Sequence, residues 1–155
     1  MGMSTDAILA YGYDLGGGDG WKINGLGEYG ELPTLDWYDP ESDEDFEEAI
    51  ERRLLAQIAN FTETDWRVDG YRARKNAAEA QLGVKLVSHC SSEYPMWVLA
   101  AHSTTAWRGS PHLFDPAELG TVPPDWDDKL RAALAALGVT PTQERPQWVL
   151  CSDWG

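Results

Sequence analysis

The residues with the clearest chemical potential are nine carboxylates within one short stretch, residues 36–51, which we call the acidic segment. It contains no Lys or Arg, and its acids are Asp36, Asp39, Glu41, Asp43, Glu44, Asp45, Glu47, Glu48 and Glu51. Residues 1–51 hold 14 acids and one base, Lys22, in a chain of net charge −14. Such a field attracts cationic surfaces and repels phosphate backbones. The pattern therefore predicts a basic protein partner and argues against direct nucleic-acid binding.

Two aromatic residues, Trp37 and Tyr38, lie within the acidic segment. Aromatic side chains dominate the hot spots of protein interfaces. We therefore expect both to act as apolar anchors for a partner, and we add them to the nine acids as candidate partner-binding residues. A second interpretation carries equal weight, because acids at the start of a helix also stabilise its dipole, and charge runs are usually solvated helix faces.

Two motif-like patterns in this region do not support a ligand site. Residues 25–30 match G-x-G-x-x-G, but prolines and acids follow them instead of the helix that a dinucleotide fingerprint requires. From Asp39 onward, acids alternate as in a calcium loop. The sixth position is Glu44 instead of Gly, and the twelfth is Ile50 instead of Glu, so the sequence excludes an EF-hand.

Histidine and cysteine are the remaining candidates for catalysis or metal binding. His89 and Cys90 are adjacent, so in a regular strand they point to opposite faces, and we expect Cys90 to pack in the core. His102, His112 and Cys151 show no recognisable ligand spacing. We predict no catalytic residue, no metal and no cofactor, and we favour a binding protein over an enzyme.

The elements that must position these residues follow from hydrophobic periodicity. Residues 7–13 read as a strand, and residues 14–41 form a long loop rich in Gly and Pro. A helix is predicted over residues 43–59, with Ser42 as its N-cap. Its apolar stripe has i, i+4 spacing and consists of Phe46, Ile50, Leu54 and Ile58.

Later segments complete the predicted fold. We expect a helix at 69–82 ended by Gly83, two strands forming an antiparallel hairpin at 84–89 and 96–107, a helical turn at 115–118, a helix from about Pro124 to Leu137, and a strand at 147–152. The main order β-α-α-β-β-α-β predicts a single α+β domain over residues 1–155. We expect a mainly antiparallel sheet of about four strands with three main helices.

Four phrases of the sequence carry a resemblance to known proteins: AYGYDLGG at 10–17, DWYDP at 36–40, FTETDW at 61–66 and ERPQW at 144–148. Through them the chain resembles small uncharacterised acidic proteins of actinobacteria and their phages. The resemblance implies no particular activity. Arg outnumbers Lys by eight to four, which is typical of a GC-rich genome and agrees with such a source.

The location of the protein is predicted from what its sequence lacks. No apolar run has the length that spans a bilayer, and the first residues lack the basic and apolar segments of a secretory signal. Two isolated cysteines make no disulfide framework. We therefore expect a cytoplasmic protein of a bacterial cell or a phage-infected host, without a membrane partner. The sequence does not specify the oligomeric state.

These observations lead to two functional hypotheses. The first is a non-enzymatic acidic module that binds a basic protein as an inhibitor, a mimic of nucleic-acid charge or an immunity-like protein. The second is a small-ligand-binding protein or enzyme with an aromatic pocket covered by the long loop. That pocket would be lined by Tyr11, Tyr13, Trp97 and Trp107, and a deep cavity holding His102 or Asp14 would favour it.

Overall fold

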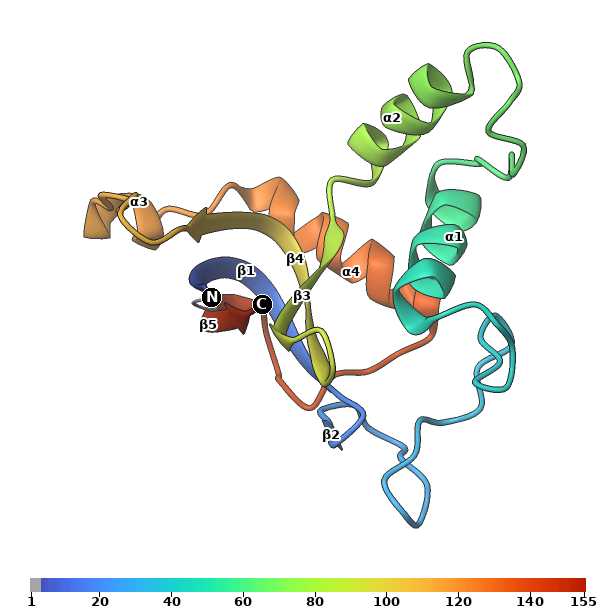
Figure 1. The fold of residues 1–155 in the computed structure, drawn as a ribbon, viewed down its shortest axis with the longest axis horizontal. Coiled ribbons are helices and arrows are strands. Elements are labelled where there is room, and N and C mark those ends of the chain that lie inside the picture. Colours follow the sequence, from blue (N-terminus) through green and yellow to red (C-terminus); the bar gives the residue numbers. More distant parts are fainter. Residues whose placement is uncertain (1–3) are drawn as a thin grey trace.

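The fold combines one curled sheet with two helices that pack on one of its faces and two that lie away from that face (Figure 1). The computed structural model describes residues 4–155; residues 1–3, which belong to the N-terminal stretch considered above for a secretory signal, lie outside the described residues. Its strands are β1 (Thr5–Gly17), β2 (Gly20–Trp21), β3 (Lys85–Ser91), β4 (Pro95–Ala106) and β5 (Gln147–Trp154). Its helices are α1 (Phe46–Ile58), α2 (Tyr71–Leu82), α3 (Pro116–Gly120) and α4 (Pro124–Leu137).

The predicted α+β class is confirmed, while its details differ. The described part of the chain has five strands and four helices, where we expected about four strands and three main helices. The added strand, β2, has 2 residues, and α3, which corresponds to the helical turn expected at 115–118, has 5 and is capped by Asp115. The first strand extends to Gly17, so residues 14–17, which the sequence pattern assigned to the long loop, belong to the sheet.

The sheet curls until its two ends meet. The strand order is β2-β1-β4-β3-β5, and β5 also pairs antiparallel with β1, from Thr5 opposite Trp154 to Gly12 opposite Gln147. Most of the pairings are antiparallel, as predicted. The exception is a parallel pairing of β3 with β5, which covers only two residue pairs at the ends of these strands.

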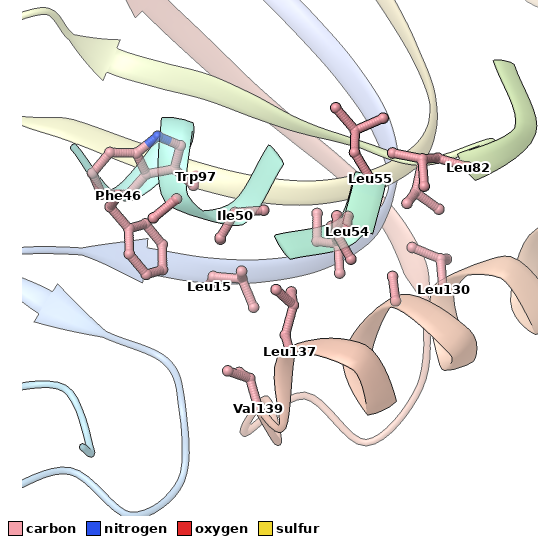
Figure 2. Packing of buried hydrophobic residues seen from close by; sticks show 14 of the residues in the cluster. Leu15, Phe46, Ile50, Leu54, Leu55, Leu82, Trp97, Leu130, Leu137 and Val139 are labelled. Atoms are coloured by element: carbon pink, nitrogen blue, oxygen red, sulfur yellow. The ribbon is translucent and has the colours of Figure 1, made fainter. Parts of the chain in front are cut away.

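The two faces of the curled sheet bury separate apolar clusters. On the inner side of the curl, a small cluster contains Ile8 and Ala10 of β1 and Val98 and Ala100 of β4. On the outer side, α1 and α4 cover the sheet and enclose the main core (Figure 2). Its most deeply buried large side chains include Leu15, Ile50, Leu54, Leu99, Leu130 and Leu137. Because residues of a strand alternate between faces, β1 and β4 contribute to both clusters.

Helix α1 has the predicted apolar stripe but a different start. Phe46, Ile50 and Leu54 are buried as expected, and Ile58 is partly buried at the end. The prediction that Ser42 is the N-cap of this helix is wrong. Asp45 caps the helix instead by accepting a hydrogen bond from the Glu48 backbone N–H at 2.8 Å. Asp and Ser are equally good N-cap residues. The helix begins after Asp45 because this start places Phe46 in the core.

The other helices end where the glycines predict. Gly83 and Gly138 follow α2 and α4 with φ of 63° and 64°, a left-handed conformation that glycine adopts at little cost. Helix α2 extends away from the sheet and buries only Ala78 and Leu82 (Figure 1). Among residues 4–155, no helix combines the length and the apolar character needed to cross a bilayer.

One core expectation in the hairpin is wrong. Cys90 is exposed, and its φ of 76° is in the left-handed region. This conformation interrupts the alternation of the strand just before the loop between β3 and β4, so the side chain does not follow the inward pattern that the sequence suggested.

Candidate functional site

A surface groove of about 680 Å³ lies beside the start of α1. Its walls come from the turn between β1 and β2, the acidic segment, and the loop between β3 and β4. We call it the acidic groove. Its acids are Asp19, Asp43, Glu44, Asp45, Glu47 and Glu93, and its aromatic residues are Trp21, Tyr38, Phe46, Tyr94 and Trp97. The acidic segment therefore forms one side of a hollow that has an aromatic lining.

The aromatic lining is a packed layer. The Trp21 and Trp97 rings stack with centroids 5.5 Å apart and planes at 7°. The Phe46 ring meets the Trp21 ring edge-on at 4.8 Å, and Tyr38 meets Phe46 in the same way at 5.3 Å. Phe46 and Trp97 also belong to the main core. The aromatic lining of the groove is therefore continuous with the main core.

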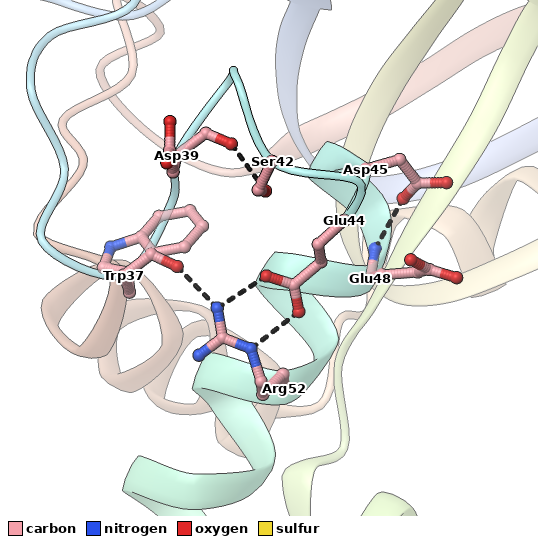
Figure 3. A network of polar contacts seen from close by, with 7 residues as sticks. All are labelled: Trp37, Asp39, Ser42, Glu44, Asp45, Glu48 and Arg52. Carbon is pink, nitrogen blue, oxygen red and sulfur yellow. Dashed lines mark hydrogen bonds and ion pairs between the residues drawn. The ribbon is translucent and has the colours of Figure 1, made fainter.

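Three acids of the acidic segment are paired with bases. The Arg52 guanidinium donates two hydrogen bonds to the Glu44 carboxylate, at 2.7 and 2.8 Å, and a third to the Trp37 backbone oxygen (Figure 3). The hydrogen bond from Arg52 lowers the pKa of Glu44. Glu51 lies 3.2 Å from the Lys75 ammonium. Asp36 is 3.9 Å from the Arg53 guanidinium and remains 81% exposed, so that pair is loose.

Six acids of the segment have no ion pair within residues 4–155: Asp39, Glu41, Asp43, Asp45, Glu47 and Glu48. Two of them have a local structural role. Asp39 accepts a hydrogen bond from the Glu41 backbone N–H, and Asp45 caps α1. The other four, Glu41, Asp43, Glu47 and Glu48, form no ion pair with a base of the described chain. Of these four, Asp43 and Glu47 line the groove.

Glu47 shows the electrostatic effect of this arrangement. Burial raises its pKa, and the nearby charges of Asp45 and Glu51 raise it further. The nearby Trp97 indole N–H lowers the pKa of Glu47. That N–H is buried and makes no hydrogen bond of standard geometry with the described residues. Burial is thus the largest cause of the raised pKa, and the two acidic neighbours act in the same direction.

The structure corrects the role expected of Trp37. Its side chain is only 6% exposed, and its indole N–H donates to the Leu137 backbone oxygen at 2.8 Å, at the end of α4. The expectation that Trp37 forms an exposed anchor is therefore wrong, because the ring fills the core. Tyr38 is partly buried and lines the groove, where burial raises its pKa, with smaller contributions from Asp45 and Asp39.

The aromatic pocket of the second hypothesis does not form as a unit. Three surface cavities stand out among the described residues, and of its four aromatic residues only Trp97 lines one of them. Tyr11 is buried and donates to the Asp127 carboxylate at 2.7 Å, and burial followed by this hydrogen bond raises its pKa to about 12. Trp107 is 61% exposed at the end of β4.

The other candidate polar residues also lie apart from these cavities. His102 stacks on Trp126 at 5.0 Å, and Asp14 accepts a hydrogen bond from Lys22 at 2.5 Å. Burial raises the pKa of Cys151 to about 11, which keeps the thiol protonated and poorly nucleophilic. Within residues 4–155, no three His, Cys, Asp or Glu side chains are grouped so that they can hold a metal ion.

Several groove residues were missed from the sequence. The loop between β3 and β4 supplies Glu93 and Tyr94, and a pair of this kind in a hairpin loop is a usable sequence signal for an exposed contact. Asp19, Trp21 and Trp97 offer no comparable signal, because only the strand pairing brings them to the acidic segment.

Comparison of the chain with protein-family models, with curated proteins and with solved structures finds no match. The likeness to small proteins of actinobacteria and their phages therefore stays an expectation.

Proposed function

We propose that this protein is a non-enzymatic binding module that engages a basic protein through the acidic groove. The observation that carries the proposal is the position of the unpaired acids. Asp43 and Glu47 of the acidic segment and Glu93 of the opposite loop line one aromatic hollow, and none of the three has an ion pair in the described chain. Like charges held together disfavour the compact state, and a cationic partner removes that cost.

The groove unites the two contributions that make a protein interface both fast and specific. Uncompensated carboxylates accelerate encounter with a basic surface, and this effect weakens as salt screens the charges. Aromatic side chains that lose water on contact supply the short-range energy.

An inhibitor, a mimic of nucleic-acid charge and an immunity-like protein are three forms of this function. In each of them, carboxylates face the Arg and Lys side chains that otherwise contact phosphates or a dedicated partner. The expected setting is the cytoplasm of a bacterial cell or a phage-infected host. A binding role is supported over catalysis by the protonated Cys151 thiol and by the position of His102 outside the cavities described above.

The test compares two variants of equal net charge. The groove variant carries Asp43→Asn, Glu47→Gln and Glu93→Gln. The control variant carries Glu28→Gln, Glu118→Gln and Glu144→Gln, three exposed acids outside the groove. Asp45 and Glu44 are kept in both, because one caps α1 and the other pairs with Arg52. Each protein is used to purify partners from host lysate at low salt and again at high salt.

We expect wild-type protein and the control variant to retain the same basic protein at low salt, and the groove variant to lose it. High salt should release it from the wild-type protein and from the control variant. Equal retention by the groove and control variants would show that net charge, and not the groove, accounts for binding, and would contradict the proposal.

A further inference from the structure

We propose that the acidic groove recognises an arginine side chain of the basic partner in preference to lysine. This inference rests on the proposed function and narrows it to one chemical group. The relevant feature is that aromatic faces and carboxylates line the same hollow: Tyr94 and Glu93 on the loop between β3 and β4, and Asp43 and Glu47 on the acidic segment.

The preference for arginine follows from the shape of the two cations. A guanidinium is planar, stacks on an aromatic ring and presents a fork of donors that matches a carboxylate. An ammonium is a compact, strongly hydrated point charge that makes no such fork. A site with carboxylates alone would accept both cations. A site with an exposed ring beside carboxylates favours the guanidinium.

The protein's own arginines make both kinds of contact, the fork of hydrogen bonds to a carboxylate and the stacking on an aromatic ring. Arg52 forms a two-pronged pair with Glu44, a groove residue, at 2.7 and 2.8 Å. Arg67 lies over the exposed Trp66 ring, with its guanidinium carbon 5.3 Å from the ring centroid. The acidic segment can therefore hold a guanidinium in the forked geometry, and an exposed ring of this protein can hold one by stacking.

Tyr94 is the ring that is available to a partner. Its side chain is 60% exposed, whereas Trp97 is 9% exposed and Phe46 is buried. The Ser91 hydroxyl accepts a hydrogen bond from the Tyr94 backbone N–H at 3.1 Å and fixes the loop that carries the ring. Glu93 precedes it and has no ion pair in the described chain. The loop thus brings a ring and a free carboxylate to one wall of the groove.

The acidic segment adds two further unpaired carboxylates to the groove. Asp43 and Glu47 form no ion pair within residues 4–155, and Arg52, the base that follows them in the sequence, is engaged by Glu44. The buried Trp97 N–H, which influences Glu47, provides a spectroscopic probe inside the site. An incoming guanidinium that meets Glu47 must change the environment of this N–H.

The test uses three nonapeptides with one backbone and three cationic positions occupied by arginine, lysine or the neutral analogue citrulline. Binding to the full-length protein is followed by the ¹⁵N-indole NMR signals of its eight Trp residues. We expect the arginine peptide to shift the Trp21 and Trp97 signals and to bind about two- to fivefold more tightly than the lysine peptide. The citrulline peptide should cause no shift.

Two variants test the role of the ring. Tyr94→Ala should weaken arginine binding about two- to fivefold and remove the preference over lysine. Tyr29→Ala, which removes a ring that is 90% exposed and lies outside the acidic groove, should change nothing. Because both side chains are exposed, the fold is expected to persist, and the remaining indole signals verify it.

The outcomes separate this inference from the proposed function. If arginine and lysine peptides bind equally well, and the groove variant weakens both, arginine selectivity is wrong while charge recognition stands. If the groove variant binds both peptides as tightly as the control variant, both proposals are wrong. Failure of the arginine peptide to bind, or shifts that spare Trp21 and Trp97, would also overturn the inference.

Discussion

The Trp21 and Trp97 rings stack face to face across Gly16, with centroids 5.5 Å apart. Both residues pair with Gly16 in the sheet, Trp21 from β2 and Trp97 from β4. The register on both sides of Gly16 therefore brings the two indoles together, and they form part of the lining of the acidic groove.

Replacing Gly16 should therefore damage both stability and the groove. A Cβ at this position would lie 2.1 Å from the Gly20 backbone oxygen, and the φ of 70° disfavours any L-residue with a side chain. We expect Gly16→Ala to lower the free energy of unfolding by about 2–4 kcal/mol in urea denaturation. Its near-ultraviolet circular dichroism, which reports aromatic packing, should weaken.

Gly18→Ala is the matched control, because a Cβ at Gly18 meets no atom within 4 Å. Its free energy of unfolding should stay within about 0.5 kcal/mol of wild type. If Gly16→Ala proved as stable as Gly18→Ala, the close approach of Gly16 to the Gly20 backbone would not be needed for the fold.

Trp37 should behave as a core residue. Trp37→Phe removes its hydrogen bond to the Leu137 backbone oxygen and part of a buried ring, and we expect a loss of about 1–3 kcal/mol in the free energy of unfolding. Trp107→Phe, at a ring that is 61% exposed, should cost less than about 0.5 kcal/mol. A surface role for Trp37 would predict the same small loss for both variants in chemical denaturation.

Arg52 should stabilise the turn before α1 through its fork of donors. Arg52→Lys keeps the charge but cannot bond Glu44 twice and the Trp37 oxygen at once, so we expect a loss of about 1–2 kcal/mol. The control is Arg131→Lys, since Arg131 pairs with Asp128 at a largely exposed position and should contribute little. Equal melting temperatures for the two variants would contradict this role of Arg52.

Glu47 should destabilise the folded protein near neutral pH. Its pKa in the folded state lies above the ordinary value of 4.5, so the folded form holds the proton more tightly than the unfolded form. Ionisation above the folded pKa therefore costs stability, and protonation below the ordinary value removes the cost. Glu47→Gln should raise the melting temperature near pH 7, and the gain should vanish at about pH 3. A gain that is independent of pH would have another cause.

The local elements could be predicted because their signals are local. The stripe of Phe46, Ile50 and Leu54 predicts α1, and Gly83 and Gly138 predict the ends of α2 and α4. The start of α1 could not be fixed in the same way, because Ser42 and Asp45 are both able to cap a helix. The choice between them depends on which one lets Phe46 reach the core.

Contacts between residues far apart in the sequence could not be predicted from hydrophobic periodicity. Trp37 lies among acids and reads as a surface residue, yet its partner oxygen on Leu137 is 100 residues away along the chain. The pairing of β5 with β1, which curls the sheet, likewise joins the two ends of the chain. Pairings of such separation leave no local signal.

Only the wall of the groove that the acidic segment forms could be predicted from the sequence. The density of acids from Asp36 to Glu51 identified the acidic wall, but the sequence did not show that Arg52 and Lys75 neutralise Glu44 and Glu51. The opposite wall, with Glu93 and Tyr94, is brought there by a hairpin whose position relative to α1 is set by core packing.

A carboxyl ¹³C NMR titration of the free protein shows whether a base neutralises the groove carboxylates. Glu47 is the unpaired example, and Glu44 is the internal contrast. We predict that Glu47 titrates above the ordinary glutamate pKa, because of burial and its acidic neighbours, and that Glu44 titrates below it, because of Arg52. A Glu47 carboxyl that titrates below the ordinary value would reveal a compensating cation and would contradict the open acidic groove.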